Sequence, residues 1–301
     1  MLKEYLGKKL TNDGKDKAKK ENEKEINYKK DSDEGIKKKA KNKDNIIIAI
    51  IKVEKNNLKK RIINSYENVK RENDKWNNES TKNEEEIKKC EIFINNKKIN
   101  FNYYYEFSNE GNYTIKYIFK DLLKSTNFMF YDCNSLISLD LSNFDTQNIT
   151  NMENMFSFCH SLRSLNLTNF DTKNVINMKD MFSSCCSLIS LNLTHFNTQN
   201  VTNMKYMFYK CNSLTSLNLS NFITHNVVYM DNMFSDCHSL VLLDLSNFNT
   251  QNVINMEYMF YDCNSLTSIN LSNLFIGDEI YTYNMFIGCN SLSYKILKSQ
   301  L

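Results

Sequence analysis

The chain has 301 residues, of which 41% are hydrophobic and 24% charged, with no proline and only six glycines. This length is enough for a hydrophobic core plus a smaller module, and the apolar fraction lies slightly below the usual globular range, which favours disorder in part of the chain. Residues 129–301 carry 7 basic and 13 acidic side chains and residues 1–128 carry 31 and 22, so the sequence predicts a basic appendage on a mildly acidic body.

The first 44 residues are rich in lysine, with KKKAKNK at 37–43. So few apolar side chains cannot offset the entropy lost on ordering, and residues 1–44 are therefore expected to form a disordered arm. Clustered lysines can also release counterions from phosphate, which makes the stretch from Lys37 to Lys43 the candidate contact with nucleic acid. The interleaved acidic residues dilute this field and favour a plain solvated tail.

The start of the chain, MLKEYLGKKLTNDG, lacks the apolar core of a signal peptide. The longest apolar run, residues 46–53, contains a lysine and is much too short to span a bilayer. The sequence therefore predicts neither export by the usual route nor a membrane span, and it favours the cytoplasm.

Residues 45–112 are expected to form a small β-rich N-terminal module that covers the open end of the C-terminal region. Its strand candidates are IIIAIIKVE at 46–54 and KKRIINSYE at 59–67, and CEIFINNKKINF at 90–101 predicts a hairpin that turns at Asn95 and Asn96. A second hairpin is expected over 103–119, with its tip at 109–111. Residues 68–86 are polar and are compatible with a helix, a loop or both.

A strict repeat occupies the C-terminal region. Met-Phe pairs recur with a constant 26-residue period, without insertion or deletion, starting at Met129, Met155, Met181, Met207, Met233, Met259 and Met285. A fixed period of this length is typical of stacked supersecondary units, none of which can bury its apolar side alone.

Two periodicities occur inside each unit. Leu139 and Leu141, two residues apart, share one face of a predicted strand, and Phe144 is expected to point inward from the turn after it. Steps of three and four then join Ile149, Met152, Met155, Phe156 and Cys159, which predicts a short helix, with Thr146 and Asn148 as candidate N-caps.

Stacked in a parallel sheet about 4.8 Å apart, seven such units make a right-handed α/β solenoid about 30 Å long. Both of its ends are degenerate. Tyr113, Ile115 and Ile118 stand where the strand residues of a preceding unit would be, so 113–128 is expected to be a capping coil. At the other end of the 129–301 solenoid, the repeat positions hold Glu279, Thr282 and Lys295, which predicts a coil that closes the stack.

The repeats SLISLDLSNFDTQNITNMENMF and SLRSLNLTNFDTKNVINMKDMF resemble the 26-residue surface-protein repeat of the BspA-type leucine-rich repeat family. The resemblance covers about 129–292. It implies a leucine-rich-repeat-like solenoid used for adhesion or protein recognition, often on cell surfaces, and it does not imply an enzyme. The missing export signal differs from what is usual for this family of surface proteins.

No catalytic, cofactor or metal site is predicted. Seven cysteines recur at one position of the unit, which predicts a ladder of small buried side chains in a reduced compartment. A disulfide is disfavoured because neighbouring side chains would point in parallel, the count is odd and no secretory route is visible, and a metal site is disfavoured because no C-x-x-C pair occurs. The four histidines, His160, His195, His225 and His238, occupy variable polar positions typical of a surface. No nucleophile elbow, P-loop, dinucleotide fingerprint or paired-carboxylate motif is present.

A protein partner is expected, and its candidate contacts are side chains that vary from unit to unit. One set follows the strand side: Ile137, Arg163, Ile189, Thr215, Val241 and Thr267. The other set is aromatic and comprises Tyr131, Tyr209 and Tyr261, together with Tyr206 and Tyr258 on the expected helix. The uniform rows on the same side, one of serines and one from Asp140 to Asn270, allow either recognition or plain hydrogen bonding along the stack.

The sequence supports two functional hypotheses. The first is a non-enzymatic interaction module, adhesive or scaffolding, that binds protein through the solenoid. The alternative is a nuclear or RNA-associated protein whose Lys-rich arm contacts nucleic acid while the solenoid holds a protein. Salt-dependent binding to nucleic acid that is lost with residues 1–44 would favour the alternative.

Overall fold

The computed structural model describes residues 45–73, 79–277 and 280–292, all of which belong to one unit, Asn42–Leu301. The predicted arm 1–44, with the candidate nucleic-acid contact from Lys37 to Lys43, lies outside the described residues. So do Glu279 and Lys295, on which the expected closing coil partly depends.

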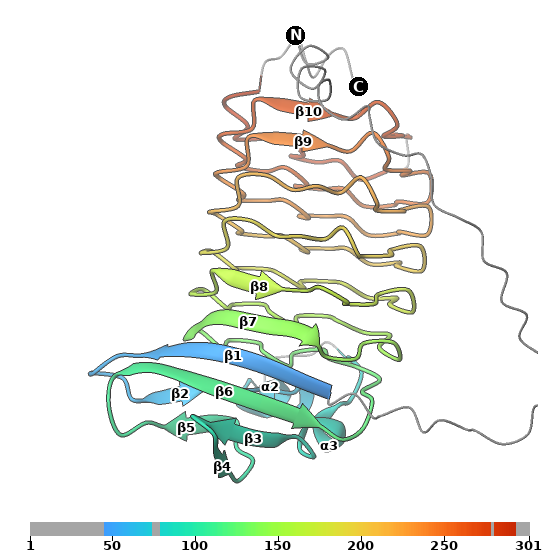
Figure 1. Ribbon diagram of the computed structural model, residues 1–301. Helices are drawn as coiled ribbons and strands as arrows, with labels where there is room; N and C mark the ends of the chain where they lie inside the picture. Colours follow the sequence, from blue (N-terminus) through green and yellow to red (C-terminus); the bar gives the residue numbers. More distant parts are fainter. Residues whose placement is uncertain (1–44, 74–78, 278–279, 293–301) are drawn as a thin grey trace, which may run out of the picture. The chain divides into compact units, whose positions relative to one another are not determined.

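Strand β1 (Asn45–Val53) is the centre of the N-terminal part. Its buried side chains alternate with more exposed ones, so one face of the strand enters the core. It pairs antiparallel with β6 (Gly111–Phe119) on one side and with β7 (Leu136–Asn143), the first strand of the repeats, on the other. Because β7 also pairs with β8 (Ser164–Asn166), one sheet of order β4-β3-β6-β1-β7-β8 continues from the N-terminal part into the repeats (Figure 1).

The hairpin predicted at 90–101 is confirmed. Strands β3 (Glu91–Ile94) and β4 (Lys97–Ile99) are antiparallel, and Asn95 and Asn96 between them have φ values of 46° and 67°, as a type I′ turn requires. The second predicted hairpin is wrong, because β5 (Tyr104–Glu106) pairs with β2 (Lys59–Arg61) rather than with β6. Sequence patterns locate strands well, but they leave the choice between two available edges open.

Two short helices lie in the polar segment before β3. Ser65 is the N-cap of the helix α2 (Tyr66–Glu72), because its hydroxyl accepts a hydrogen bond from the Asn68 N–H. The second helix, α3 (Glu84–Ile87), spans one turn. An ion pair of 2.6 Å between Arg71 and Glu84 joins them. The hydrogen bonds from Arg71 are the main reason why the pKa of Glu84 falls to about 2.

The boundary expected at residue 112 falls inside β6, and the expected capping coil 113–128 is only half present. Residues 113–119 belong to β6, and β1 lies between β6 and β7. Parallel pairing between units starts with the bridge from Ser125 to Asn151. We therefore call residues 124–292 the repeat array.

Successive units of the repeat array lie directly against one another. Parallel partners occupy the same repeat position in consecutive units, both in β7 and β8, where Leu139 pairs with Leu165, and in β9 (Leu242–Asp244) and β10 (Ser268–Asn270). A second line of parallel bridges with the same spacing runs through Ser125, Asn151, Asn177, Asn203, Tyr229, Asn255 and Tyr281.

The expected short helix of each unit is replaced by turns, and no helix is present in the described part of the repeat array. The N–H groups of Asn154, Phe156 and Phe158 donate to carbonyls of the next unit at 2.9–3.0 Å. An α-helix would keep these donors within its own turns. Asn154 and Phe158 also have φ values of 56° and 61°, which interrupt any helix.

Thr146 joins two units instead of capping a helix. Its hydroxyl donates to the Asp171 carbonyl and accepts from the Asp171 N–H, both at 2.8 Å. Asn148 likewise caps nothing; its equivalent in the next unit, Asn174, donates to the Gln147 carbonyl at 2.7 Å. Contacts between units therefore satisfy the groups that the sequence assigned to a helix end.

The core of the repeat array consists of ladders of identical side chains. Phe144 is buried as predicted, and one series of stacked phenylalanine rings runs from Phe130 to Phe286 with centroids 5.2–6.2 Å apart. The cysteine ladder is confirmed as buried, and its seven thiols are free in the structure. From Cys159 to Cys289, each thiol donates to a phenylalanine carbonyl of the preceding unit at 3.0–3.2 Å.

Candidate interaction surface

The strand-side candidates form one continuous row, which we call the strand row: Ile137, Arg163, Ile189, Thr215, Val241 and Thr267. Backbone N–H groups in the row donate to carbonyls of the preceding unit at 2.9–3.4 Å, for example from Arg163 to Ile137. Ile137 is half-buried and the other five side chains are exposed. The row therefore presents changing side chains, and the backbone N–H groups of Arg163, Thr215, Val241 and Thr267 are already bonded.

Apolar side chains stand out on this surface. Ile189 is 59% exposed, and Leu242, which comes directly after Val241 of the strand row, is 57% exposed. Sequence reasoning passed over Leu242, although it replaces the serine found in other units. An exposed leucine in a serine position is the signal that could have found it.

The uniform row from Asp140 to Asn270 has a local structural role. In each unit this side chain accepts a hydrogen bond from the N–H two residues later, as Asp140 does from Ser142 at 2.9 Å. Asn166 also donates to Asp140 at 2.9 Å. These contacts account for the row by turn formation and by bonding along the stack.

The tyrosine candidates lie in the turns of each unit and are half-buried rather than fully exposed. Tyr206 and Tyr209 form an edge-to-face pair with ring centroids 5.3 Å apart, and Tyr258 and Tyr261 repeat this arrangement at 5.7 Å. Tyr131 packs against Phe128 at 5.3 Å. The placement of Tyr206 and Tyr258 on a helix was wrong, and the structure pairs each of them with the other tyrosine of its unit.

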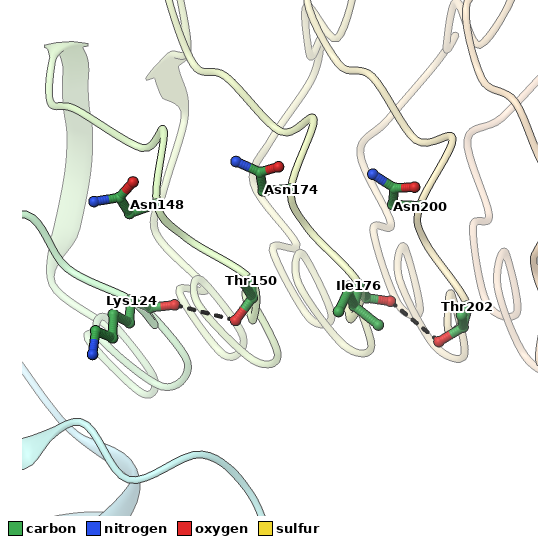
Figure 2. A pocket seen from close by; sticks show the side chains of 7 residues that line it. All are labelled: Lys124, Asn148, Thr150, Asn174, Ile176, Asn200 and Thr202. Atoms are coloured by element: carbon green, nitrogen blue, oxygen red, sulfur yellow. Dashed lines mark hydrogen bonds between the residues drawn. The ribbon is translucent and has the colours of Figure 1, made fainter.

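A groove of about 710 Å³ runs across the first units, and the sequence did not predict it. Figure 2 shows Asn148, Asn174 and Asn200 in one line and Thr150, Ile176 and Thr202 in a second, with Lys124 at one end. The hydroxyls of Thr150 and Thr202 donate to main-chain carbonyls of the preceding unit at 3.3–3.4 Å. Five of the seven residues that line the groove carry an amide or a hydroxyl group. The amides of Asn174 and Asn200 also donate to main-chain carbonyls of the preceding unit, both at 2.7 Å.

A row of charged side chains is another feature that the sequence reasoning missed. Glu153, Lys179, Lys205 and Asp231 occupy one repeat position, and ion pairs of 3.1 and 2.6 Å join Lys179 to Glu153 and Lys205 to Asp231. Beside them, burial raises the pKa of Asp180 to about 7. The change between acidic and basic residues at this one repeat position was visible in the sequence and could have revealed the row.

The ladder thiols are buried, whereas most of the histidines are exposed. Burial raises the pKa of the ladder thiols and of the half-exposed Cys186, so none of them is activated as a nucleophile. His160, His195 and His225 are exposed and His238 is half-buried. Within the described ranges, one group that could hold a metal ion comprises Asp236, His238 and Asp262.

None of the described helices is long and apolar enough to cross a membrane. No curated protein and no solved structure matches the chain. The sequence does match a family described as Mycoplasma protein of unknown function, DUF285, over residues 124–218 and again over residues 186–299. Because the two matches together cover more than half of the 301 residues and coincide with the repeat array, the chain belongs to the DUF285 family.

Proposed function

We propose that the repeat array is a right-handed solenoid that serves as a non-enzymatic protein-interaction module, in adhesion or scaffolding. The observation that carries this proposal is the exposure of Ile189 and Val241 in the strand row and of the adjacent Leu242, at 59%, 40% and 57%. Exposed apolar side chains that vary along a rigid row are typical of protein-binding surfaces.

The chemistry of the strand row supports a protein as the partner. Four of its six N–H groups, those of Arg163, Thr215, Val241 and Thr267, are already bonded to the preceding unit, so a partner meets mainly side chains rather than a free strand edge. Apolar residues alternate with Arg163, Thr215 and Thr267, which offer polar contacts between them. A surface of this kind buries apolar area and still discriminates between partners.

We further assign the repeats to the BspA-type leucine-rich repeat class of surface proteins. Leu136, Leu139 and Leu141, which carry the L-x-x-L-x-L motif, are all buried, and this burial supports the assignment. Under it, the partner is met at the cell surface. Labelling of intact cells with a membrane-impermeant reagent tests this location, since a protein protected from the reagent would favour an intracellular scaffold.

Site-specific photocrosslinking tests the binding surface directly. A photoreactive phenylalanine analogue replaces Ile189 or Val241 in the full chain, in the cells that express it, and Ile223 provides the matched control because it is 43% exposed but lies outside the strand row. We expect one discrete crosslinked protein from positions 189 and 241 and none from 223. Equal crosslinking at all three positions, or none at 189 and 241, would contradict the proposal.

A further inference from the structure

We propose that Asp236, His238 and Asp262 form a binding site for one divalent cation of the Zn²⁺ type. A ring nitrogen of His238 and one carboxylate oxygen from each aspartate lie within 4.8 Å of one another, and all three residues are half-buried. Protein binding through the strand row does not require such a site, so this inference goes beyond the proposed function.

The donor set suits a borderline metal ion. Imidazole nitrogen together with two carboxylate oxygens is a common ligand set for Zn²⁺, whereas Mg²⁺ and Ca²⁺ prefer oxygen alone. Bonds of about 2.1 Å place tetrahedral ligand atoms about 3.4 Å apart, so the three atoms need to close in by no more than about 1.4 Å. Three protein ligands also leave one position for water.

The main chain around the site is fixed by contacts between units. Asp236 and Asp262 occupy the same position in consecutive units, with φ values of 60° and 57°, and their N–H groups donate to carbonyls of the following unit at 2.8 and 2.7 Å. Aspartate tolerates this left-handed conformation, which explains an aspartate at each position. The left-handed conformation does not explain why His238 follows Asp236 and lies close to Asp262.

A hydrogen bond to the following unit orients the His238 ring, as it does for His160, whose Nδ1 lies 3.0 Å from the Ser184 carbonyl oxygen. His238 Nδ1 lies 2.9 Å from the Asp262 carbonyl oxygen and 3.8 Å from an Asp262 carboxylate oxygen, and because the carbonyl oxygen can only accept, Nδ1 carries the proton. Nε2 of the same ring keeps the lone pair that can bind a metal ion. Such a hydrogen bond from the second ring nitrogen to a backbone carbonyl is a usual accompaniment of metal-binding histidines.

The charges around the site favour a cation. The two carboxylates come from adjacent units and lie within 4.8 Å of each other. Lys210, one unit before Asp236, interacts electrostatically with it, but within the described chain no lysine or arginine forms an ion pair with either carboxylate at 4.0 Å or less. Repulsion between like charges at this separation is relieved when a cation binds between them. At the equivalent place around His160 the flanking residues are Phe158 and Ser184, so that histidine has no carboxylate partners.

Zinc titration calorimetry of the full chain, with Cys186→Ser in every sample to remove the half-exposed thiol, tests the site. Asp236→Ser, His238→Asn and Asp262→Ser remove one ligand each, and other units carry serine or asparagine at these repeat positions, so the fold tolerates them. His160→Asn is the matched control. Thermal unfolding without zinc verifies that all variants fold like the parent.

We expect the parent to bind one Zn²⁺ per chain, each of the three ligand variants to bind at least about tenfold more weakly, and His160→Asn to bind like the parent. The proposal is overturned if the parent shows no saturable binding. It is equally overturned if the ligand variants retain the parent's affinity, or if His160→Asn weakens binding as much as His238→Asn does.

Discussion

Two residues of every unit adopt a left-handed backbone conformation, and the chain rarely uses glycine for them. The first of these positions runs from Phe128 to Asn284, once per unit, and the second from Asp132 to Gly288. Asparagine and aspartate, whose short polar side chains tolerate this conformation, occupy seven of these fourteen positions. This use explains how a chain with six glycines builds so many tight turns.

Asp180 is one of these left-handed residues and is the group most sensitive to pH. Burial raises its pKa to about 7, against an ordinary value of 3.8; the charge of Lys179 opposes this shift and that of Glu153 adds to it. Between about pH 4 and pH 7 the folded chain therefore keeps a proton that the unfolded chain releases. Asp180 consequently lowers the free energy of unfolding as pH rises through this window, and the loss is complete above pH 7.

Asp180→Asn is expected to remove this dependence. Asparagine occupies the same position in Asn154, Asn232 and Asn284, with φ values of 56–57°, so the backbone accepts it. At pH 8 the variant should exceed the parent in free energy of unfolding by about 1–3 kcal/mol, and near pH 4 the two should coincide. Urea unfolding at pH 4, 6 and 8 measures this, with the exposed Asp145→Asn as control; parallel profiles for parent and variant would refute the assignment.

Cys186 is expected to react before any other thiol of the native protein. It is half-exposed, whereas the other eight cysteines are buried and all nine are free. Its pKa is raised by partial burial, so alkylation should be slow at pH 7 and accelerate at higher pH. Mass spectrometry after brief alkylation should find a single modified residue, absent in Cys186→Ser. Rapid modification of several ladder thiols would show that the core opens.

Within the repeat array, a threonine of each unit uses its hydroxyl to bond both backbone groups of one residue in the following unit. Thr198 donates to the Ile223 carbonyl at 2.9 Å and accepts from the Ile223 N–H at 2.8 Å, and it is fully buried. The same pair of bonds recurs at Thr172, Thr224 and Thr250. Each threonine thus completes the backbone pairing where two consecutive units lack strand hydrogen bonds.

Thr198→Val should destabilise the repeat array by about 1–3 kcal/mol, because it keeps the shape of the side chain but removes the hydroxyl that bonds both the N–H and the C=O of Ile223, at about 0.5–1.5 kcal/mol for each bond. The free energy of unfolding in urea measures the effect. Thr194→Val is the control, since Thr194 is exposed and bonds only to Asn192 of the same turn. A loss of equal size in both variants would show that the bonds between units are not responsible.

For the whole molecule, the decisive contact is the pairing of β1 with β7. It covers the edge of the first repeat strand over Leu136–Asn143 and joins the N-terminal strands and the repeat array into one sheet. An uncovered strand edge with apolar neighbours pairs readily with other chains.

A chain that begins at residue 120 should therefore self-associate. Removal of residues 1–119 deletes β1 and leaves β7 without its antiparallel partner, whereas removal of residues 1–44 alone leaves β1 in place. Size-exclusion chromatography with light scattering should find larger species for the first truncation and the mass distribution of the full chain for the second. If the chain 120–301 matches the full chain in both dispersity and thermal stability, β1 does not protect this edge.

The sequence by itself determined the 26-residue period and the positions that are buried. Met155, Phe156 and Cys159 and their counterparts must lie in the core because a side chain repeated at a constant interval meets the same surroundings in every unit. The strand leucines, the inward Phe144 and the hairpin at Asn95 and Asn96 result from equally local rules of spacing and turn chemistry.

Only the tertiary structure decided where hydrogen bonds between distant residues form. Steps of three and four residues predicted a helix at 149–159, but its N–H groups find carbonyls in the next unit, and no periodicity within one unit distinguishes the two outcomes. The insertion of β1 between β6 and β7 and the convergence of Asp236, His238 and Asp262 depend in the same way on residues that the chain separates and the fold brings together.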